Sequence, residues 1–224
     1  MNAERLAEAV GPIVVKEVRQ GLRGKAFAIT FGLLLFACLV TALAAAAEAT
    51  ELDSRVLGPR YLTLFLSGLS VICFFVIPYH AYRSMARERE EETWVLLVLT
   101  GLSSRRIVRG KLASAISQAA LYASAGAPFI VFSYFLNGVD IPTVLVALLF
   151  TASWSVMLTA LAVALGTQGE SRLGRTVSHF ATLILLGLAT FAATAWAARF
   201  AERGGQWLED DKFRYFVLAF PLVT

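Results

Sequence analysis

Residues 86–101 read AREREEETWVLLVLTG, in which six charged side chains (87–92) precede Thr93 and six apolar residues (94–99). Placing the charged side chains in hydrocarbon would cost about 2.5 to 3.5 kcal/mol for each of them, so this part of the segment lies in water. A helix over residues 93–100 would be roughly 12 Å long, which is too short to cross a bilayer. The segment therefore predicts a short apolar helix that stays on one side of a membrane.

The composition of the chain around this segment is that of a membrane protein. Hydrophobic residues make up 58% of the 224 residues and charged residues only 16%, which excludes an ordinary water-soluble domain. A spanning helix needs about 20 mostly apolar residues. Five stretches meet that length: residues 27–47, 61–82, 112–136, 144–166 and 177–198. We therefore expect an all-α polytopic membrane protein that forms a single transmembrane domain over residues 1–224.

Two further features complete this outline of the spans. A sixth apolar run, residues 213–224, has only twelve residues and would reach about 18 Å as a helix. It predicts an incomplete sixth span, which is either a half-helix or the start of a longer one. The connection between the third and fourth spans, residues 137–142, reads NGVDIP and predicts a minimal turn.

The basic residues are distributed unevenly between the two sides of the expected membrane domain. Residues 1–26, 83–111 and 167–178 hold fourteen of the 20 Lys and Arg residues, and the connections on the other side hold six. Because cytoplasmic loops carry an excess of Lys and Arg, the amino terminus and the segment 83–111 are expected in the cytoplasm. The net charge of +4 is explained by this topology, and we expect no nucleic-acid partner.

The stretch before the first span predicts an amphipathic helix over residues 12–24. Pro12 suits the first turn of a helix, and apolar side chains recur every four residues at Val14, Val18 and Leu22. The other faces are polar and include the cations Lys16, Arg19 and Arg23. We expect this helix to lie along the inner membrane surface, with those cations as anchors to lipid headgroups. The alternative is a solvated tail with a chance periodicity.

The second span is expected to continue as a helix into the cytoplasm, because residues 81–92 contain neither Gly nor Pro. Thr93 can cap the short helix 93–100 and Gly101 can end it. That helix is apolar nearly all round, with one face formed by Trp94, Leu97 and Val98. One face can pack on the membrane domain, but the other needs cover. A partner protein is therefore expected.

Cations follow the short helix at the start of the third span. Residues 103–111 read SSRRIVRGK. We expect Arg105, Arg106 and Lys111 to anchor the third span at the lipid headgroups, together with Arg109.

Two stretches of this chain resemble the permease subunits of type-2 ABC exporters. They are REREEETWVLLVLTGLSSRRIVRGKL, residues 87–112, and GPIVVKEVRQGLRGKAF, residues 11–27. In that family an Arg- and Glu-rich helix extension is followed by a short coupling helix headed by Thr, and a Gly-Lys pair opens the third span. The resemblance covers roughly residues 11–112, and beyond them only the spacing of the spans is similar. Gly101 stands where the family usually has Pro, and Glu92 where Gly often precedes the Thr.

The resemblance implies that the helix 93–100 docks in a groove of a separate ABC ATPase subunit, and that the amphipathic stretch is an elbow helix. The residues implied at the ATPase-coupling interface are Arg87, Glu88, Glu90, Thr93, Trp94, Leu97 and Val98. A second permease copy, identical or homologous, would complete the export path. The expected location is the cell membrane, a bacterial inner membrane. The family has a complete sixth span, which this chain lacks or carries only in part.

The sequence contains no phosphate-binding loop of the form G-x-x-x-x-G-K-[ST], so ATP hydrolysis is expected in the separate subunit. We expect no cofactor and no enzymatic activity of this chain. Two alternatives remain open. One is an intramembrane enzyme or a haem protein that uses the two histidines, His80 and His179, as axial ligands. The other is a passive channel or scaffold.

Two prolines fall inside expected spans. Pro78 would free the backbone carbonyl of Phe74 and can kink the second span, and Pro128 would free that of Ser124 in the third. Such prolines are packing features more often than they are hinges.

Overall fold

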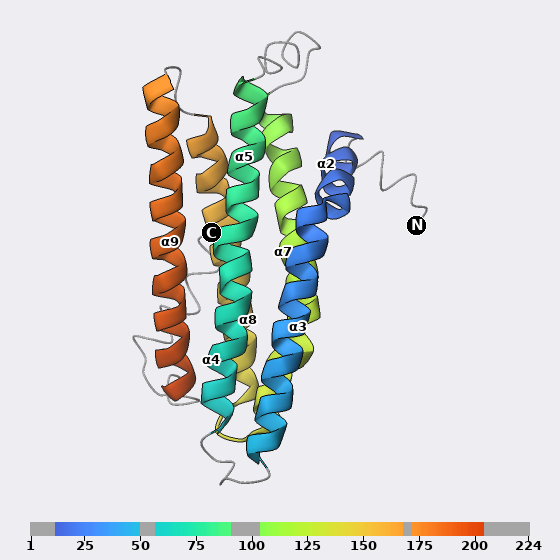
Figure 1. Cartoon of the computed structure of the whole chain (residues 1–224), viewed down its shortest axis with the longest axis vertical. Coiled ribbons are helices and arrows are strands. Elements are labelled where there is room, and N and C mark those ends of the chain that lie inside the picture. The colour runs from blue at the N-terminus through green and yellow to red at the C-terminus, as the bar shows by residue number, and fades with distance from the viewer. Residues whose placement is uncertain (1–11, 50–56, 91–103, 168–171, 204–224) are drawn as a thin grey trace.

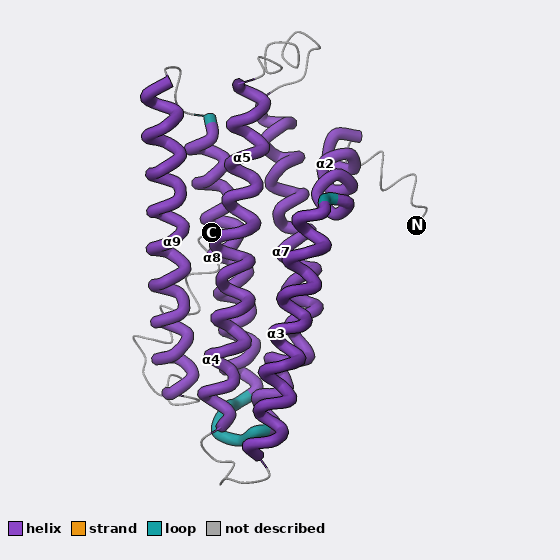
Figure 2. The backbone as a smooth tube through the Cα atoms, viewed as in Figure 1, coloured by secondary structure: helices purple, strands orange, loops and turns teal. Residues whose placement is uncertain are grey.

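The computed structural model describes residues 12–49, 57–90, 104–167 and 172–203. This part of the chain is helical except for short turns, and it contains no strand (Figure 2). In chain order the elements are α2 (Pro12–Arg23), α3 (Lys25–Ala49), α4 (Leu57–Ser70), the π-helix η2 (Val71–Val76), α5 (Ile77–Glu90), α7 (Ser104–Phe135), α8 (Ile141–Gly166) and α9 (Arg172–Arg203). The expected all-α fold is confirmed for the described residues.

Within the described ranges, five helical segments are long and apolar enough to cross a membrane: Lys25–Ala49, Leu57–Arg87, Val108–Phe135, Ile141–Gly166 and Leu173–Arg203. Each corresponds to one of the five spans expected from the sequence. The incomplete sixth span at 213–224 lies outside the described residues.

The spanning helices stand side by side in one bundle, with α2 beside α7 near one end (Figure 1). The second span is a single rod made of α4, η2 and α5. α4 packs mainly against α9 and α7, and also against α3, whereas α5 packs mainly against α8. The second span therefore contacts all the other spanning helices, which makes it the centre of the fold.

The turn between α7 and α8 is as short as the sequence predicts. Asn137 and Gly138 both adopt positive φ angles, 63° and 84°, which Asn and Gly tolerate best. α4 begins directly against this turn. A Cβ atom on Gly58 would overlap the backbone carbonyl of Asn137, so only glycine allows this approach.

The amphipathic helix predicted over residues 12–24 is present as α2, and Gly24 lies outside the helix. It packs closely on α7 through Gly21, whose missing side chain leaves room for the amide of Gln118. Arg19 and Arg23 are exposed. These residues thus form a helix, and its role as an elbow helix along a membrane surface stays a prediction.

Candidate functional site

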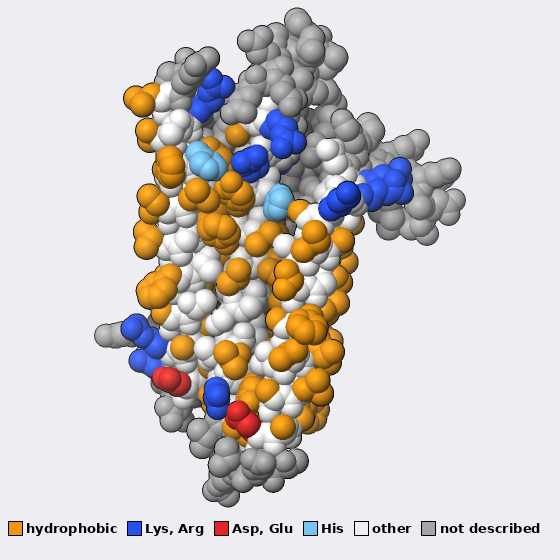
Figure 3. All heavy atoms as spheres, in the orientation of Figure 1, with side chains coloured by type: hydrophobic (Ala, Val, Ile, Leu, Met, Phe, Trp, Pro, Cys, Tyr) orange, Lys and Arg blue, Asp and Glu red, His pale blue; other side chains and the backbone are white. Residues whose placement is uncertain are grey.

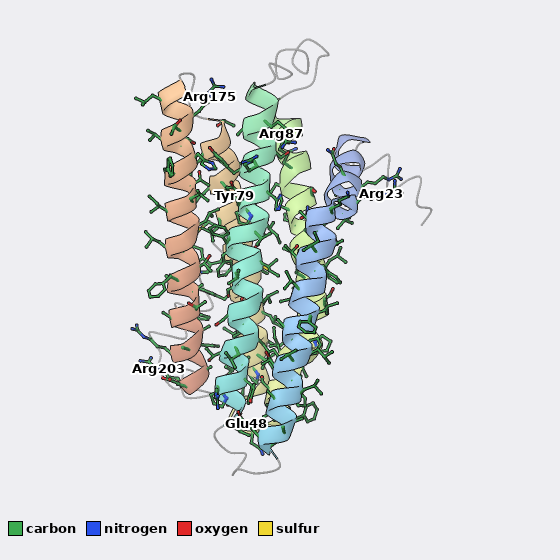
Figure 4. All side chains as sticks on the ribbon, in the orientation of Figure 1. Arg23, Glu48, Tyr79, Arg87, Arg175 and Arg203 are labelled. Carbon is green, nitrogen blue, oxygen red and sulfur yellow. The ribbon has the colours of Figure 1, made fainter. Side chains whose placement is uncertain are left out.

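One end of the bundle carries most of the features that the sequence singles out. Arg23, Arg87 and Arg175 lie at this end, on α2, α5 and α9, while Glu48 and Arg203 lie at the opposite end (Figure 4). Lys and Arg side chains gather over the same region in the space-filling view (Figure 3). We call it the Arg87 end. The segment 91–103, which contains the predicted coupling helix, joins α5 to α7 here and lies outside the described residues.

The helical extension predicted for the second span is present as far as the structure describes it. α5 is a continuous helix to Glu90, three residues past the apolar segment that ends at Arg87. Arg87 is exposed on this extension. The side chains of Glu88 and Glu90, and the residues Thr93, Trp94, Leu97 and Val98, lie outside the description, so their assignment to an ATPase interface stays a prediction.

The base of this extension is tied to α7 by a buried lysine. Lys111 has only 3% of its surface exposed, and its Nζ donates a hydrogen bond of 2.6 Å to the Oγ of Ser84 on α5. The prediction that Lys111 anchors the third span at lipid headgroups is therefore wrong in position. Its long side chain turns into the bundle, because the polar Ser84 offers the ammonium a partner there.

The remaining predicted anchors divide into two groups. Arg19, Arg23 and Arg109 are exposed, as an anchoring role requires. The side chains of Lys16, Arg105 and Arg106 lie outside the described set. Contact of any of them with lipid stays a prediction.

A second contact holds α5 against α8 at the same level. Met85 is 1% exposed and packs with Ala81 of its own helix, with Val163 of α8 and with Val108 of α7. Gly166 makes this approach possible, because a Cβ atom there would lie only 3.0 Å from the Cβ of Met85. At the base of the extension, α5 is thus held to α8 by close packing as well as to α7 by a hydrogen bond.

The third contact at the Arg87 end comes from α9. The imidazole of His179 lies 5.9 Å, centroid to centroid, from the rings of both Tyr79 and Tyr82. Tyr79 lies on α5, nearer to Arg87 than to Glu48 at the opposite end, as seen in Figure 4. His80 is exposed. The two histidines form separate patches in Figure 3, so this arrangement gives no support to a haem held between them.

Below these contacts the second span contains a wide turn that the sequence reasoning did not anticipate. In η2 the backbone N–H of Ile77 donates to the carbonyl of Ile72, five residues earlier instead of four. Pro78 has no N–H to donate. The carbonyl of Cys73 therefore receives no hydrogen bond from its own helix in either the α or the π pattern.

The vacant carbonyl is satisfied from a neighbouring helix. Ser155 of α8 donates its hydroxyl to the Cys73 carbonyl over 2.9 Å, and both residues are buried. A buried carbonyl without a partner would cost about 1 to 3 kcal/mol. Pro78 was the only residue in the sequence that indicated an irregular helix at this place. We expected it to act on the Phe74 carbonyl, and the structure adds a disturbance that extends over the six residues of η2, Val71–Val76.

Pro128 has a milder effect on α7. The helix continues through this residue from Ser104 to Phe135 without a change of helix type. The hydroxyl of Ser124 bonds to the carbonyl of Leu121 in its own helix.

These contacts tie α5 to three neighbouring helices at the Arg87 end: to α7 through Lys111, to α8 through Met85 and to α9 through the two tyrosines. The described residues hold no group of three or more His, Cys, Asp or Glu side chains that could bind a metal ion.

We compared the chain with protein-family models, with curated proteins and with solved structures, and none of them matches it. The fold and the contacts at the Arg87 end are therefore interpreted from this chain alone.

Proposed function

We propose that the chain is the membrane-spanning permease subunit of an ABC exporter, driven by a separate ATPase through the segment 93–100. The observation that carries the proposal is the course of α5. The most buried span leaves the apolar part of the bundle as one helix and leads directly into a charged and then apolar segment. A helix attached in this way can carry a motion from outside the membrane into the bundle.

The mechanism proposed for coupling follows from the three contacts of α5. When ATP closes the ATPase subunits, the segment 93–100 moves with them and displaces α5. Because α5 is hydrogen-bonded to α7 and closely packed on α8, these helices follow it. A second permease copy, identical or homologous, faces the first, and the export path opens between them.

The proposal includes an orientation in which the Arg87 end faces the cytoplasm of a bacterial cell. Its support is the excess of Lys and Arg in the segments at that end of the bundle. Single cysteines introduced as Arg87→Cys and Asp140→Cys test it, since both positions are exposed and Asp140 makes no side-chain cap hydrogen bond. In intact cells a membrane-impermeant maleimide should label only the second variant. Labelling of the first alone would reverse the orientation.

The native cysteines do not interfere with this measurement. Cys38 and Cys73 are 5% and 2% exposed and lie within the bundle. The unsubstituted protein therefore serves as the unlabelled control.

The ATPase partner is tested by purifying the tagged full chain from its native membranes in mild detergent. The measurement is the vanadate-sensitive ATP hydrolysis that co-purifies with the chain. Replacing Trp94 and Leu97 together by Asp should abolish this activity, because two buried charges would oppose docking. The matched control replaces Trp207 and Leu208 by Asp, the same residue types in another charged segment. Equal ATP hydrolysis with both double variants would refute the docking assignment.

A further inference from the structure

The second span changes its packing partners at the wide turn. On one side of η2, α4 packs mainly against α9 and α7, and on the other side α5 packs mainly against α8. η2 itself contacts both α8 and α9. The rod thus joins two groups of helices, and the junction between them coincides with an interruption of its own hydrogen-bond pattern. Wide turns and prolines are the usual sites at which a helix can bend.

A side chain of α8 bridges this junction with a hydrogen bond. Ser155 donates from α8 to the Cys73 carbonyl in η2. Its neighbours on α8 behave differently: Thr151 donates to the carbonyl of Ala147, and Thr159 donates to that of Ser155, each four residues earlier in the same helix. The Ser155 hydroxyl has the same option with the carbonyl of Thr151. It can therefore leave η2 without losing a hydrogen-bond partner.

We propose that η2 is a hinge in the second span and that Ser155 is the positioning residue that holds it closed. With the Ser155 hydroxyl on Cys73, α5 stays aligned with α4. When the hydroxyl turns to the Thr151 carbonyl, the Cys73 carbonyl loses its partner and α5 tilts relative to α4. Pro78 keeps the hinge at this place, because it supplies no N–H that could complete the helix. The inference goes beyond the proposed function and holds whatever partner moves α5.

The hinge is tested by measuring a distance along the second span in the full chain, reconstituted in lipid nanodiscs. Spin labels are attached at Leu64→Cys in α4 and Arg83→Cys in α5, both exposed positions. The labelled residues are roughly 28 Å apart along a helix. Pulsed electron paramagnetic resonance measures distances in this range well. The protein with Ser155 should give one narrow distance distribution. Ser155→Ala should broaden it or add a second distance.

Two further variants separate a hinge from a general loss of packing. Thr151→Val removes a hydroxyl one turn away that bonds only within its own helix in the structure, and it should leave the distribution narrow. Pro78→Ala supplies a backbone N–H that can complete the helix across η2. Combined with Ser155→Ala, it should restore the narrow distribution.

Hydrogen exchange gives a second reading of the same variants. The backbone amides of residues 75–77 should exchange roughly threefold to tenfold faster in Ser155→Ala than in the parent protein, and at the parent rate in Thr151→Val. The proposal is overturned if Ser155→Ala leaves both the distance distribution and the exchange unchanged. It is overturned as well if adding Pro78→Ala to Ser155→Ala does not restore the narrow distance distribution.

Discussion

The first and second spanning helices are both strongly apolar, yet they occupy opposite positions in the bundle. In the most apolar 18 residues of Lys25–Ala49, 11% of the residues are buried. In the corresponding 18 residues of Leu57–Arg87, 61% are buried. α3 leaves a row of large side chains uncovered: Ile29, Leu33, Phe36, Leu39, Val40 and Leu43. Apolar character suits a helix equally to lipid and to a protein core, because both are hydrocarbon. It therefore does not distinguish a peripheral span from a central one.

The largest expected effect comes from removing the same side chain at the two positions. Phe74 of the second span is 1% exposed, and Phe36 of α3 is 65% exposed. Phe74→Ala should lower the free energy of unfolding by about 3 kcal/mol because it leaves a cavity. Phe36→Ala should change it far less, since lipid chains fill the space. Reversible unfolding in mixed micelles measures both, and equal losses would abolish the distinction between the two helices.

The second effect concerns two glycines. Gly58→Ala would bring a Cβ atom into the backbone carbonyl of Asn137, whereas Gly32→Ala meets nothing within 4 Å. We expect Gly58→Ala to destabilise the protein by about 1 to 3 kcal/mol through overpacking. Gly32→Ala should be neutral or stabilising, because alanine favours the helix. The same unfolding assay distinguishes them. A harmless Gly58→Ala would show that α4 can move away from the turn.

A smaller effect is expected where α3 is attached to α7. The hydroxyls of Thr30 and Tyr122 share a hydrogen bond between these helices, and the ring of Tyr122 packs against Phe27 and Phe31. Tyr122→Phe keeps the ring and removes the hydroxyl, so it should cost about 0.6 kcal/mol. The control is Tyr134→Phe on the exposed side of α7. A cost above that of Phe74→Ala would make α3 the better-fixed helix.

The smallest effect is expected at the opposite end of the bundle. Arg60 of α4 donates to Glu48 of α3 over 3.1 Å, with side chains 63% and 33% exposed. A double-mutant cycle with Arg60→Gln and Glu48→Gln should give a coupling energy below about 0.5 kcal/mol, because solvent screens the pair. A much larger value would mean that an ion pair, and not packing, holds α3 to the second span.

The sequence was a good guide to elements whose signal is local. The five spans follow from the length of their apolar stretches, α2 follows from its four-residue repeat, and the turn at Asn137 follows from its residue types. The continuation of the second span to Glu90 was also predictable, since no Gly or Pro interrupts it.

The features missed were those that depend on a distant partner. Lys111 has the sequence surroundings of a headgroup anchor, but in the bundle it is buried and bonds to Ser84 of α5. Ser155 is one of several hydroxyl residues in α8, and nothing near it in the sequence distinguishes it from Thr151 or Thr159. The coupling segment 93–100, on which the functional proposal depends, lies outside the described residues and stays a prediction.

The sequence by itself therefore determined that the described part of this chain is helical and holds five helices fit to span a membrane, because apolar length and helix periodicity are properties of contiguous residues. The tertiary structure alone decided which span is central, where the second span opens into a wide turn and which hydroxyl bonds to the carbonyl left free there. Those outcomes depend on side chains from separate helices meeting in space. A buried carbonyl or ammonium takes whichever partner lies within reach of a hydrogen bond, and sequence distance does not reveal that partner.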